Sequence, residues 1–431
     1  MLHISARCCL ATLYLLVLAT GTGLPLAEAQ EDVTQTAVPV GQQSTPTPTP
    51  EGPTRLVVWM PDVLWPVDNN EIDEVLAAQI EAFEIAEENV VVDLRRKKAD
   101  DVGGIMSTLR TARDVAPGAL PDLTLVRRPD LLSARRGELI ESLEGQASSA
   151  IIGDLFNVAL QLGQIDGELF GLPYMLEVHL TAYRNGVIND DAGWRFEDVL
   201  ARDIPYVFPA GRTGGLSDVF FVQYVAAGGT LPVGNELVPD EGALRQTFQF
   251  YDDAHQAGII DERVLNYTKS ADYGAAFADG SIDIALVTST LYLTLLDQGH
   301  NLRSAPLPTA SGEADTFVNG WMWVLTTSSP DRQALAVRFL NAMMVTEQQG
   351  HIARSIHMLP SQRTAFQNME VEELDKDLVN RMLSNAILPL SDEATGPVTR
   401  AMQSALVAVI SDARSAGEAT QDVLDASQSG G

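Results

Sequence analysis

The sequence has very few cysteines. Its two cysteines, Cys8 and Cys9, lie in an apolar segment (residues 8–20) that follows Arg7 and precedes the small-x-small pattern at 27–29. This arrangement is typical of a cleaved export signal, which predicts a signal peptide over residues 1–29. The mature chain would then contain no disulfide and no cysteine-ligated metal. No cysteine follows the apolar region, so we expect no lipid-modified cysteine; an uncleaved signal kept as an anchor is the alternative.

Positive charge is also scarce. The 431 residues include 28 Lys and Arg against 58 Asp and Glu, which gives a formal net charge of −30. A surface of this sign repels phosphate backbones and anionic lipids, so we expect no nucleic-acid partner. The hydrophobic content of 45% is enough for a sizeable core. The charge itself is explained by solubility.

Catalytic motifs are missing as well. The sequence has no Gly-x-Ser-x-Gly elbow, no phosphate-binding loop and no Gly-x-Gly-x-x-Gly after its first expected strand. The six histidines are scattered without metal-ligand spacing. We therefore predict no enzymatic activity, no catalytic residues, no metal and no cofactor.

Residues 30–54 differ from the rest of the chain, because Thr and Pro alternate there and little is apolar. This composition predicts a semi-rigid linker, with a disordered leader as the alternative. From Arg55 onward, short apolar runs alternate with helical spacing. Strands are expected at 55–60, 89–95 and 121–126, and helices at 71–88 and 103–115. This order predicts βαβ units and a parallel sheet.

The second half is richer in helix. Helices are expected at 147–162 and 216–227, after Asp240, and from the Ser329-Pro330-Asp331 start, where Ser329 supplies an N-cap hydroxyl. Strands are expected at 281–287 and 318–327. After Pro360 the chain should be mostly helical to about residue 425. The residues thus predict an α/β protein.

Several segments, taken in order, resemble the extracellular solute-binding proteins of ABC importers, in particular the carbohydrate-type family similar to maltose-binding protein. The resemblance covers about residues 55–425. The most specific segment is IDGELFGLPYMLEVHLTAYRNGVI (165–188), and it is supported by PDLTLV (121–126), AAFADGSIDIALVTS (275–289), VNGWMWVL (318–325) and HMLPSQRTAF (357–366).

The resemblance implies a two-lobed periplasmic-binding-protein-like fold with three interlobe crossovers, near 174–180, 318–323 and 357–361, and a ligand cleft between the lobes. One lobe would comprise 55–176 and 320–358, and the other 177–319 and 359–431. It also implies an extracytoplasmic, monomeric receptor that closes on a solute and delivers it to the transmembrane subunits of an importer.

The implied solute is a small carbohydrate. Aromatic residues make up only 6% of the chain, which favours a mono- or disaccharide over a long oligosaccharide. Two alternatives remain open. One is the same fold binding a polyamine, an organic anion or a peptide, and the other is a secreted carbohydrate-processing hydrolase.

The ligand contacts expected within this fold come from strand ends and crossovers. Trp65 and Asp68 follow the first strand, Arg127 ends the third, and Ser289 follows a strand at a helix start. Trp321 lies where the family pattern approaches the cleft. Packing within one lobe, solvated surface or a hinge role is the alternative for each candidate. The predicted contacts are Trp65, Asp68, Arg127, Tyr174, Glu177, Ser289, Trp321 and His357.

Overall fold

The computed structural model describes residues 52–429, except 189–192, 213–214, 234–235, 372–373 and 391–395. The predicted signal peptide (1–29) and most of the predicted linker (30–54) lie outside the described residues. Residues 52–431 form one compact unit. Within the described ranges, no helix has both the length and the apolar character needed to cross a membrane.

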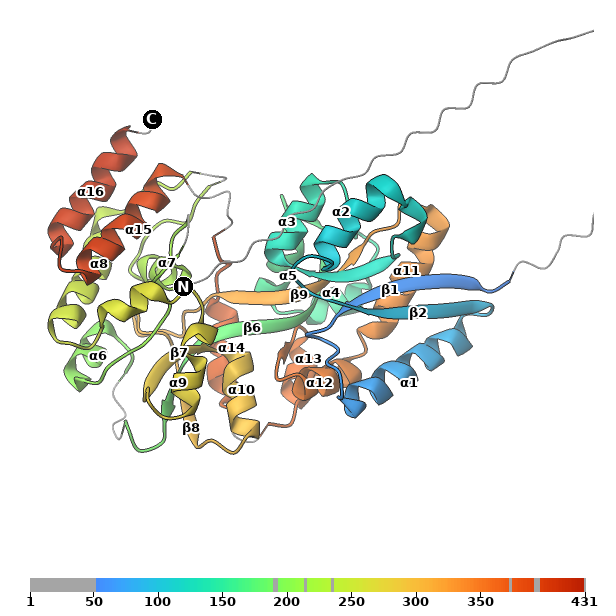
Figure 1. Cartoon of the computed structure of the whole chain (residues 1–431), viewed down its shortest axis with the longest axis horizontal. Helices are drawn as coiled ribbons and strands as arrows, with labels where there is room; N and C mark the ends of the chain where they lie inside the picture. The colour runs from blue at the N-terminus through green and yellow to red at the C-terminus, as the bar shows by residue number, and fades with distance from the viewer. Residues whose placement is uncertain are drawn as a thin grey trace, which may run out of the picture. The chain divides into compact units, whose positions relative to one another are not determined.

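The first part of this unit alternates strand and helix as predicted (Figure 1). Ile72, Leu76 and Phe83 repeat at helical spacing and are buried on one side of the first helix. The Asn69 side chain caps that helix by accepting a hydrogen bond from the Ile72 amide at 3.2 Å. The elements are β1 (Thr54–Pro61), α1 (Asn70–Ala86), β2 (Val90–Lys97), α2 (Ile105–Val115), η1 (Pro117–Ala119), β3 (Leu123–Arg127) and α3 (Arg128–Arg136).

Besides β1, β2 and β3, the main sheet contains β6 (Gly171–Arg184), β9 (Val318–Leu325) and β10 (Leu359–Pro360), in the strand order β10-β6-β9-β3-β1-β2. β1 pairs in parallel with β2 and β3, which is the arrangement that two βαβ units produce. β9 (Val318–Leu325) pairs antiparallel with β3, although nearly two hundred residues separate them in the chain. The parallel sheet expected from the sequence is therefore a mixed sheet, because strands from later in the chain extend it.

β6 (Gly171–Arg184) connects two regions of the molecule. Its residues up to Val178 pair with β9, and its residues from His179 onward pair with β7 (Ile284–Thr288) and β8 (Leu302–Ala305). The short β10 (Leu359–Pro360) pairs with β6 at Met175 and Leu176. Figure 1 shows β6 and β9 side by side in the middle of the unit.

Two expected helix features differ in the structure. The helix expected at 147–162 is divided at Leu155 and Phe156, because the Phe156 amide donates to the Ser361 carbonyl at 3.1 Å and Leu155 bridges Gln362. Within the described part of the chain, the Ser329 hydroxyl makes no capping hydrogen bond to the helix that follows it, and this helix begins at Pro330. The two short helices are α4 (Ser149–Asp154) and α5 (Asn157–Gly163).

The remaining elements are mainly helical, as expected for the second half. Short strands β4 (Gln164–Ile165) and β5 (Glu168–Leu169) form a hairpin before β6. The helices are α6 (Phe196–Arg202), α7 (Asp218–Ala226), α8 (Glu241–Gln256), η2 (Glu262–Asn266), η3 (Ser270–Asp272), α9 (Gly274–Ala278), α10 (Ser289–Asp297), α11 (Pro330–Met343), α12 (Thr346–Ser355), α13 (Arg363–Asn368), α14 (Lys376–Asn385), α15 (Pro397–Ile410) and α16 (Ala416–Ser429).

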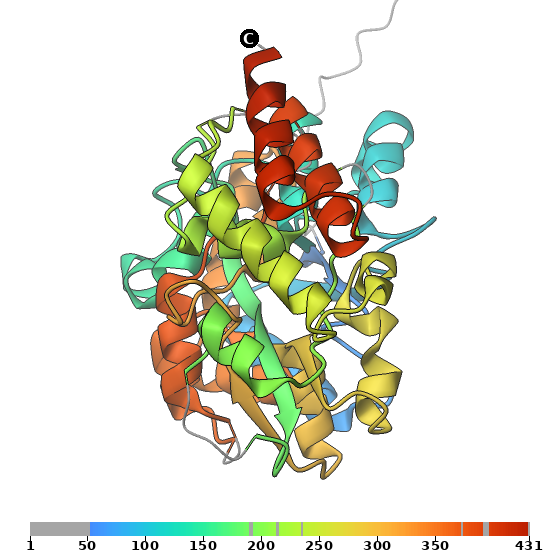
Figure 2. The same cartoon turned by 90° about the vertical axis from the view of Figure 1, so that its left-hand side faces the viewer.

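Buried apolar side chains form two clusters. The first surrounds the main sheet and includes Trp59, Phe83 and Trp323. The second lies among α6, α7, α8, α15 and α16 and includes Phe220 and Phe248. Figure 2 faces these helices and shows α15 and α16 in red next to α8 in yellow-green.

Strand β7 contributes to both clusters because its side chains alternate between its faces. Ile284 and Leu286 belong to the second cluster, whereas Ala285 and Val287 belong to the first. The two clusters therefore meet along β6 and β7.

Candidate functional site

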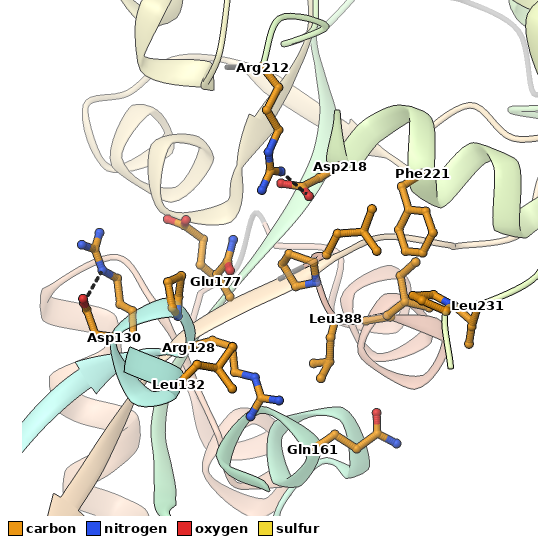
Figure 3. Close-up of a pocket in the computed structure, with 18 of the residues that line it drawn as sticks. Arg128, Asp130, Leu132, Gln161, Glu177, Arg212, Asp218, Phe221, Leu231 and Leu388 are labelled. Carbon is orange, nitrogen blue, oxygen red and sulfur yellow. Dashed lines mark ion pairs between the residues drawn. The ribbon is translucent and has the colours of Figure 1, made fainter. Parts of the chain in front are cut away.

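A cavity of about 1040 Å³ opens beside β6 and β9, at the place where the two clusters meet (Figure 3). Residues at the end of β3 and on α3 line one side of it, and residues before and within α7 line the other. A second cavity, of about 700 Å³, adjoins the first. The two share five lining residues: Glu177, Arg212, Asp218, Thr268 and Asn319. We refer to the combined space as the cleft.

The floor of the cleft is formed by a cross-strand pair. Glu177 on β6 lies opposite Asn319 on β9 in the antiparallel register. Both side chains are half-buried. Burial raises the pKa of Glu177, while the hydroxyls of Thr290 and Thr288 and the charge of Arg127 oppose that shift.

The strand β9 must lie very close to β6 at this floor. Gly320 follows Asn319, and a Cβ atom at this position would lie 2.5 Å from the Met175 carbonyl oxygen. Only glycine permits this backbone approach. The VNGW motif therefore positions the Asn319 amide as well as the tryptophan that follows it.

One wall of the cleft is built from consecutive arginines. Arg127 forms ion pairs with Asp100 and, at 4.0 Å, with Asp130. Its guanidinium lies 5.1 Å from the centre of the Trp321 ring, within the range of a cation–π contact. Arg128 donates to the carbonyl oxygens of Leu162, at 2.8 Å, and Gln164.

Burial affects the charged groups of this wall. It raises the pKa of Asp130, while the charge of Arg127 opposes that shift. It also lowers the pKa of Arg128, while the charge of Asp166 opposes this change. The wall therefore holds charges that are partly removed from water.

The opposite wall carries a further ion pair. Arg212 contacts Asp218, in the first turn of α7, at 2.6 Å. Figure 3 shows the labelled Arg212 and Arg128 on different sides of the pocket, with Glu177 between them in this view. Phe221 adds an apolar face to this wall. Opposite charges and hydrogen-bonding groups thus face the same space from both sides.

The second cavity is bordered by a stacked pair of rings. His179 and Phe317 have ring centres 3.9 Å apart and planes inclined by 19°. Burial lowers the pKa of His179 to about 3, while a hydrogen bond with the Phe317 backbone opposes this shift. His179 is therefore neutral at physiological pH. Its Nδ1 atom has no hydrogen-bond partner among the described residues.

The sequence-predicted residues are distributed over several places. Arg127 and Glu177 line the cleft. Trp321 lies directly beneath Arg127 with 7% of its surface exposed. Ser289 is fully buried, and its hydroxyl accepts a hydrogen bond from the Val178 amide at 3.2 Å. It therefore supports the strand next to Glu177.

Besides Trp321 and Ser289, four further predicted residues do not line either cavity of the cleft. Tyr174 is fully buried and packs against Trp323. The Trp65 indole donates to Asp73 at 2.5 Å. Asp68 is exposed at a positive φ of 69°. His357 borders a separate cavity of about 680 Å³, where it lies 3.5 Å from Asp297.

Several cleft residues were not among the predicted contacts. Asn319 could have been found from the same VNGW motif that indicated Trp321. Arg212 lies in a glycine-rich loop, a composition that can mark a binding loop. His179 and Asp218 carry no local signal, because their proximity to Glu177 depends on strand pairing and on how α7 packs. Among the described residues, no group of three or more His, Cys, Asp or Glu is placed to hold a metal ion.

Comparisons with known proteins agree with this architecture. A family model for bacterial extracellular solute-binding proteins matches residues 78–377. No curated protein matches the sequence.

Solved structures are similar over nearly their whole length. The cyclic alpha-maltosyl-1,6-maltose binding protein of Arthrobacter globiformis has a TM-score of 0.70 and 16% identity, with 88% of this chain and 99% of that chain covered. The maltose-binding periplasmic protein MalE of Listeria monocytogenes, in complex with maltose, has a TM-score of 0.65 and 14% identity, with 87% and 97% covered. Maltose-bound MalE3 of T. maritima has a TM-score of 0.63 and 16% identity, with 87% and 99% covered. The similarity confirms the predicted two-lobed α/β fold.

Proposed function

This chain belongs to the bacterial extracellular solute-binding protein family, and from that premise we propose that it is the extracytoplasmic receptor of an ABC importer. It would capture a small carbohydrate in the cleft and deliver it to the transmembrane subunits. The single observation that carries this proposal is the cleft itself. It lies between two apolar clusters that meet along β6 and β7, and side chains from both sides reach it.

The chemistry of the cleft supports a polar, hydroxyl-rich solute. Glu177, Asn319 and Thr268 present carboxylate, amide and hydroxyl groups, which are the partners that sugar hydroxyls need. Phe221 and Phe317 are the aromatic residues lining the described cleft. With so few rings, the cleft favours a mono- or disaccharide over a long stacked oligosaccharide. The similar structures named above bind maltose or a cyclic maltose derivative.

We expect closure to occur where β6 changes its partner strands, between Val178 and His179. A solute that contacts both walls shifts the open–closed equilibrium by its preference for the closed form. Changing the ratio of closed to open protein from 1:99 to 99:1 requires the solute to prefer the closed form by about 5.5 kcal/mol. The predicted lobes, 55–176 with 320–358 and 177–319 with 359–431, would move as two bodies. Phe366 packs against Phe156, so the segment after β10 also contacts the first of these bodies.

A predicted signal peptide and linker would place the receptor outside the cytoplasm, and an uncleaved signal would tether it there. Comparing the mass of the protein from the cell envelope with that of the full chain tests cleavage near Gln30. A mature N-terminus near this residue supports export and release. An intact N-terminus supports the anchored alternative.

The sugar proposal is tested by a thermal-shift screen of the protein from Gln30 onward with mono- and disaccharides, polyamines and amino acids. A ligand at 100 times its Kd adds about 2.7 kcal/mol of stability, which raises the melting temperature measurably. We expect saccharides to give the largest shifts and small-angle scattering to show a smaller radius of gyration with the same sugar. Shifts from polyamines or amino acids alone would contradict the carbohydrate proposal. Cleavage of a saccharide by the purified protein would indicate a hydrolase.

A further inference from the structure

The charge of the cleft is opposite in sign to that of the whole protein. The chain carries 28 basic and 58 acidic residues. Five of the basic residues line the cleft, whereas only three of the acidic ones do, so the lining residues have a formal excess of two positive charges, which the pairing of Arg127 with Asp100 beside the cleft reduces to one. The basic residues are Arg127, Arg128, Arg136, Arg212 and Lys269, and the acidic ones are Asp130, Glu177 and Asp218.

Two of the three acidic groups of the cleft are groups that burial makes costly to ionise. Desolvation raises the pKa of Glu177 and of Asp130. The arginines stay charged, because a guanidinium has an intrinsic pKa far above physiological pH. The positive excess in the cleft therefore persists, and it grows if either carboxyl binds a proton.

The positive groups lie on both walls. Arg127, Arg128 and Arg136 belong to the end of β3 and to α3, whereas Arg212 and Lys269 lie on the α7 side. When the cleft narrows, these like charges come closer, which opposes closure. A neutral sugar would leave that repulsion in place, whereas an anionic group between the walls would convert it into attraction.

Guanidinium groups suit this role. Each has five N–H donors in a planar fork that matches the oxygens of a carboxylate or a phosphate. The ion pair between Arg212 and Asp218 and the backbone bonds of Arg128 hold these forks in place before a solute arrives. Preorganised donors lose less conformational entropy on binding.

We propose that the solute is an acidic saccharide whose carboxylate or phosphate group lies between the arginines of β3–α3 and Arg212. This inference rests on the proposed function and names its substrate class. The sugar hydroxyls would face Glu177 and Asn319 on the floor. The positive cleft therefore favours a negatively charged solute, although the whole protein has a net charge of −30.

The test compares neutral and acidic sugars with the same ring skeleton by isothermal titration calorimetry on the chain from Gln30 onward. The first set is glucose, glucuronate and glucose 6-phosphate, which also distinguishes a carboxylate from a phosphate. The second pair is α-1,4-digalacturonate and its dimethyl ester. We expect at least one acid to bind about tenfold or more tightly than its neutral counterpart, and we expect this advantage to shrink between 0.05 and 0.5 M NaCl.

Matched variants test whether the tighter binding of acidic sugars depends on the cleft. Arg212→Gln and Lys269→Gln should each weaken binding of the acidic sugar several-fold, with the larger loss for Arg212. Lys269 is exposed, so its substitution keeps the test valid if Arg212→Gln does not fold. Arg245→Gln, on α8, is the control because Arg245 pairs with Glu241 away from the cleft and should leave binding unchanged.

Two results would overturn the inference. If every neutral sugar that binds does so as tightly as its acid at low salt, the inference is overturned and the proposed carbohydrate receptor stays intact. An acid advantage that neither Arg212→Gln nor Lys269→Gln reduces would place the anion elsewhere and would also overturn it. If no saccharide of either kind binds, the proposed function fails together with the inference.

Discussion

Glu177 lies at the point where β6 leaves β9 and begins to pair with β7, and this position gives it two opposing properties. It faces the cleft, yet it is buried enough that its pKa is raised. Groups whose pKa is shifted by burial cluster at functional sites, because solvation in water would favour leaving them exposed unless the site has a use for them. The residue was predicted from the family pattern, and the structure places it at the centre of the floor.

We expect Glu177→Gln to weaken saccharide binding without lowering stability. A hydrogen bond to a charged group contributes about 1.5–3 kcal/mol, so the affinity for the tightest neutral sugar of the panel should fall about tenfold or more. The melting temperature at pH 7 should stay equal or rise, because the variant removes a carboxylate that burial disfavours.

Calorimetry and thermal denaturation measure both effects. Glu74→Gln, on the exposed face of α1, is the matched control and should change neither quantity. Unchanged affinity in Glu177→Gln would remove this residue from the binding site.

His179 should make stability depend on pH. Its folded-state pKa is lowered to about 3 because burial penalises the imidazolium. Between pH 6.5 and about 3, the unfolded chain binds a proton at this residue and the folded chain does not. Stability therefore decreases as the pH falls, by up to about 1.4 kcal/mol per pH unit from this residue.

Urea unfolding at pH 7, 6 and 5 measures this slope. The His179→Phe variant should lose less stability than the wild type between pH 7 and pH 5, because it has no imidazole to protonate. His300→Asn, a change at a half-buried loop residue, should keep the wild-type slope. Equal slopes for all three proteins would show that His179 is not the responsible group.

The candidate site could be predicted only in part at this scale. Arg127 and Glu177 carry sequence signals, because one ends a strand and the other lies in the most specific family segment. His179 carries no such signal, because a lone histidine in a strand has no local pattern. The glycine-rich loop around Arg212 indicates a binding loop but not which residues the arginine meets. Their role depends on which residues the tertiary structure places opposite them.

At the scale of elements, local patterns predicted most helices and strands. The periodicity of α1 and the apolar run of β1 depend on near neighbours, so both were found within a few residues of their observed ends. The division of α4 from α5 was missed because it depends on Ser361 and Gln362, which are distant in the chain. The change of partner strands within β6, between Val178 and His179, lies within the crossover that the family resemblance implied near 174–180, but which strands pair there depends on distant residues.

Asp122 links three elements and is expected to stabilise their arrangement. It is 2% exposed, and its carboxylate accepts hydrogen bonds from the Val57 amide at 2.8 Å and from Arg332 Nε at 2.7 Å. Asp122→Ala leaves the buried amide unpaired and Arg332 without its partner. We expect a loss of about 3 kcal/mol in the free energy of unfolding, at the lower end for a broken buried pair because Arg332 is partly exposed.

Urea denaturation of the two proteins measures this loss. The control is Asp331→Ala, an exposed acid in the first turn of α11, which should cost only about 0.3–1 kcal/mol. Similar losses for the two variants would contradict the role of Asp122 in joining β1, β3 and α11.

At the scale of the whole molecule, the net charge of −30 should act against compactness. Exposed like charges repel one another over distances that salt screens, since the Debye length falls from about 10 Å at 0.1 M to about 3 Å at 1 M. We therefore expect the melting temperature to rise by several degrees between 0.02 and 0.3 M NaCl.

Calorimetry in NaCl and in KCl would distinguish general screening from the binding of one cation. Screening should raise the melting temperature equally in the two salts, whereas binding of one cation should not. A melting temperature that falls with salt would show that attractive ion pairs, such as those between Arg338 and Glu87, outweigh the repulsion. This dependence concerns the unliganded protein and adds to the salt effect expected on the binding of acidic sugars.

The sequence alone determined the alternation of strands and helices, the acidic charge and the family of this protein, because each of these depends on composition or on residues close together in the chain. The tertiary structure decided which side chains share the cleft. Glu177 and Asn319 meet through the antiparallel register of β6 and β9, and Arg212, before α7, and Arg128, on α3, line the same cleft from different sides. Such a site depends on pairing between distant segments, and hydrophobic periodicity contains no information about which distant segments pair.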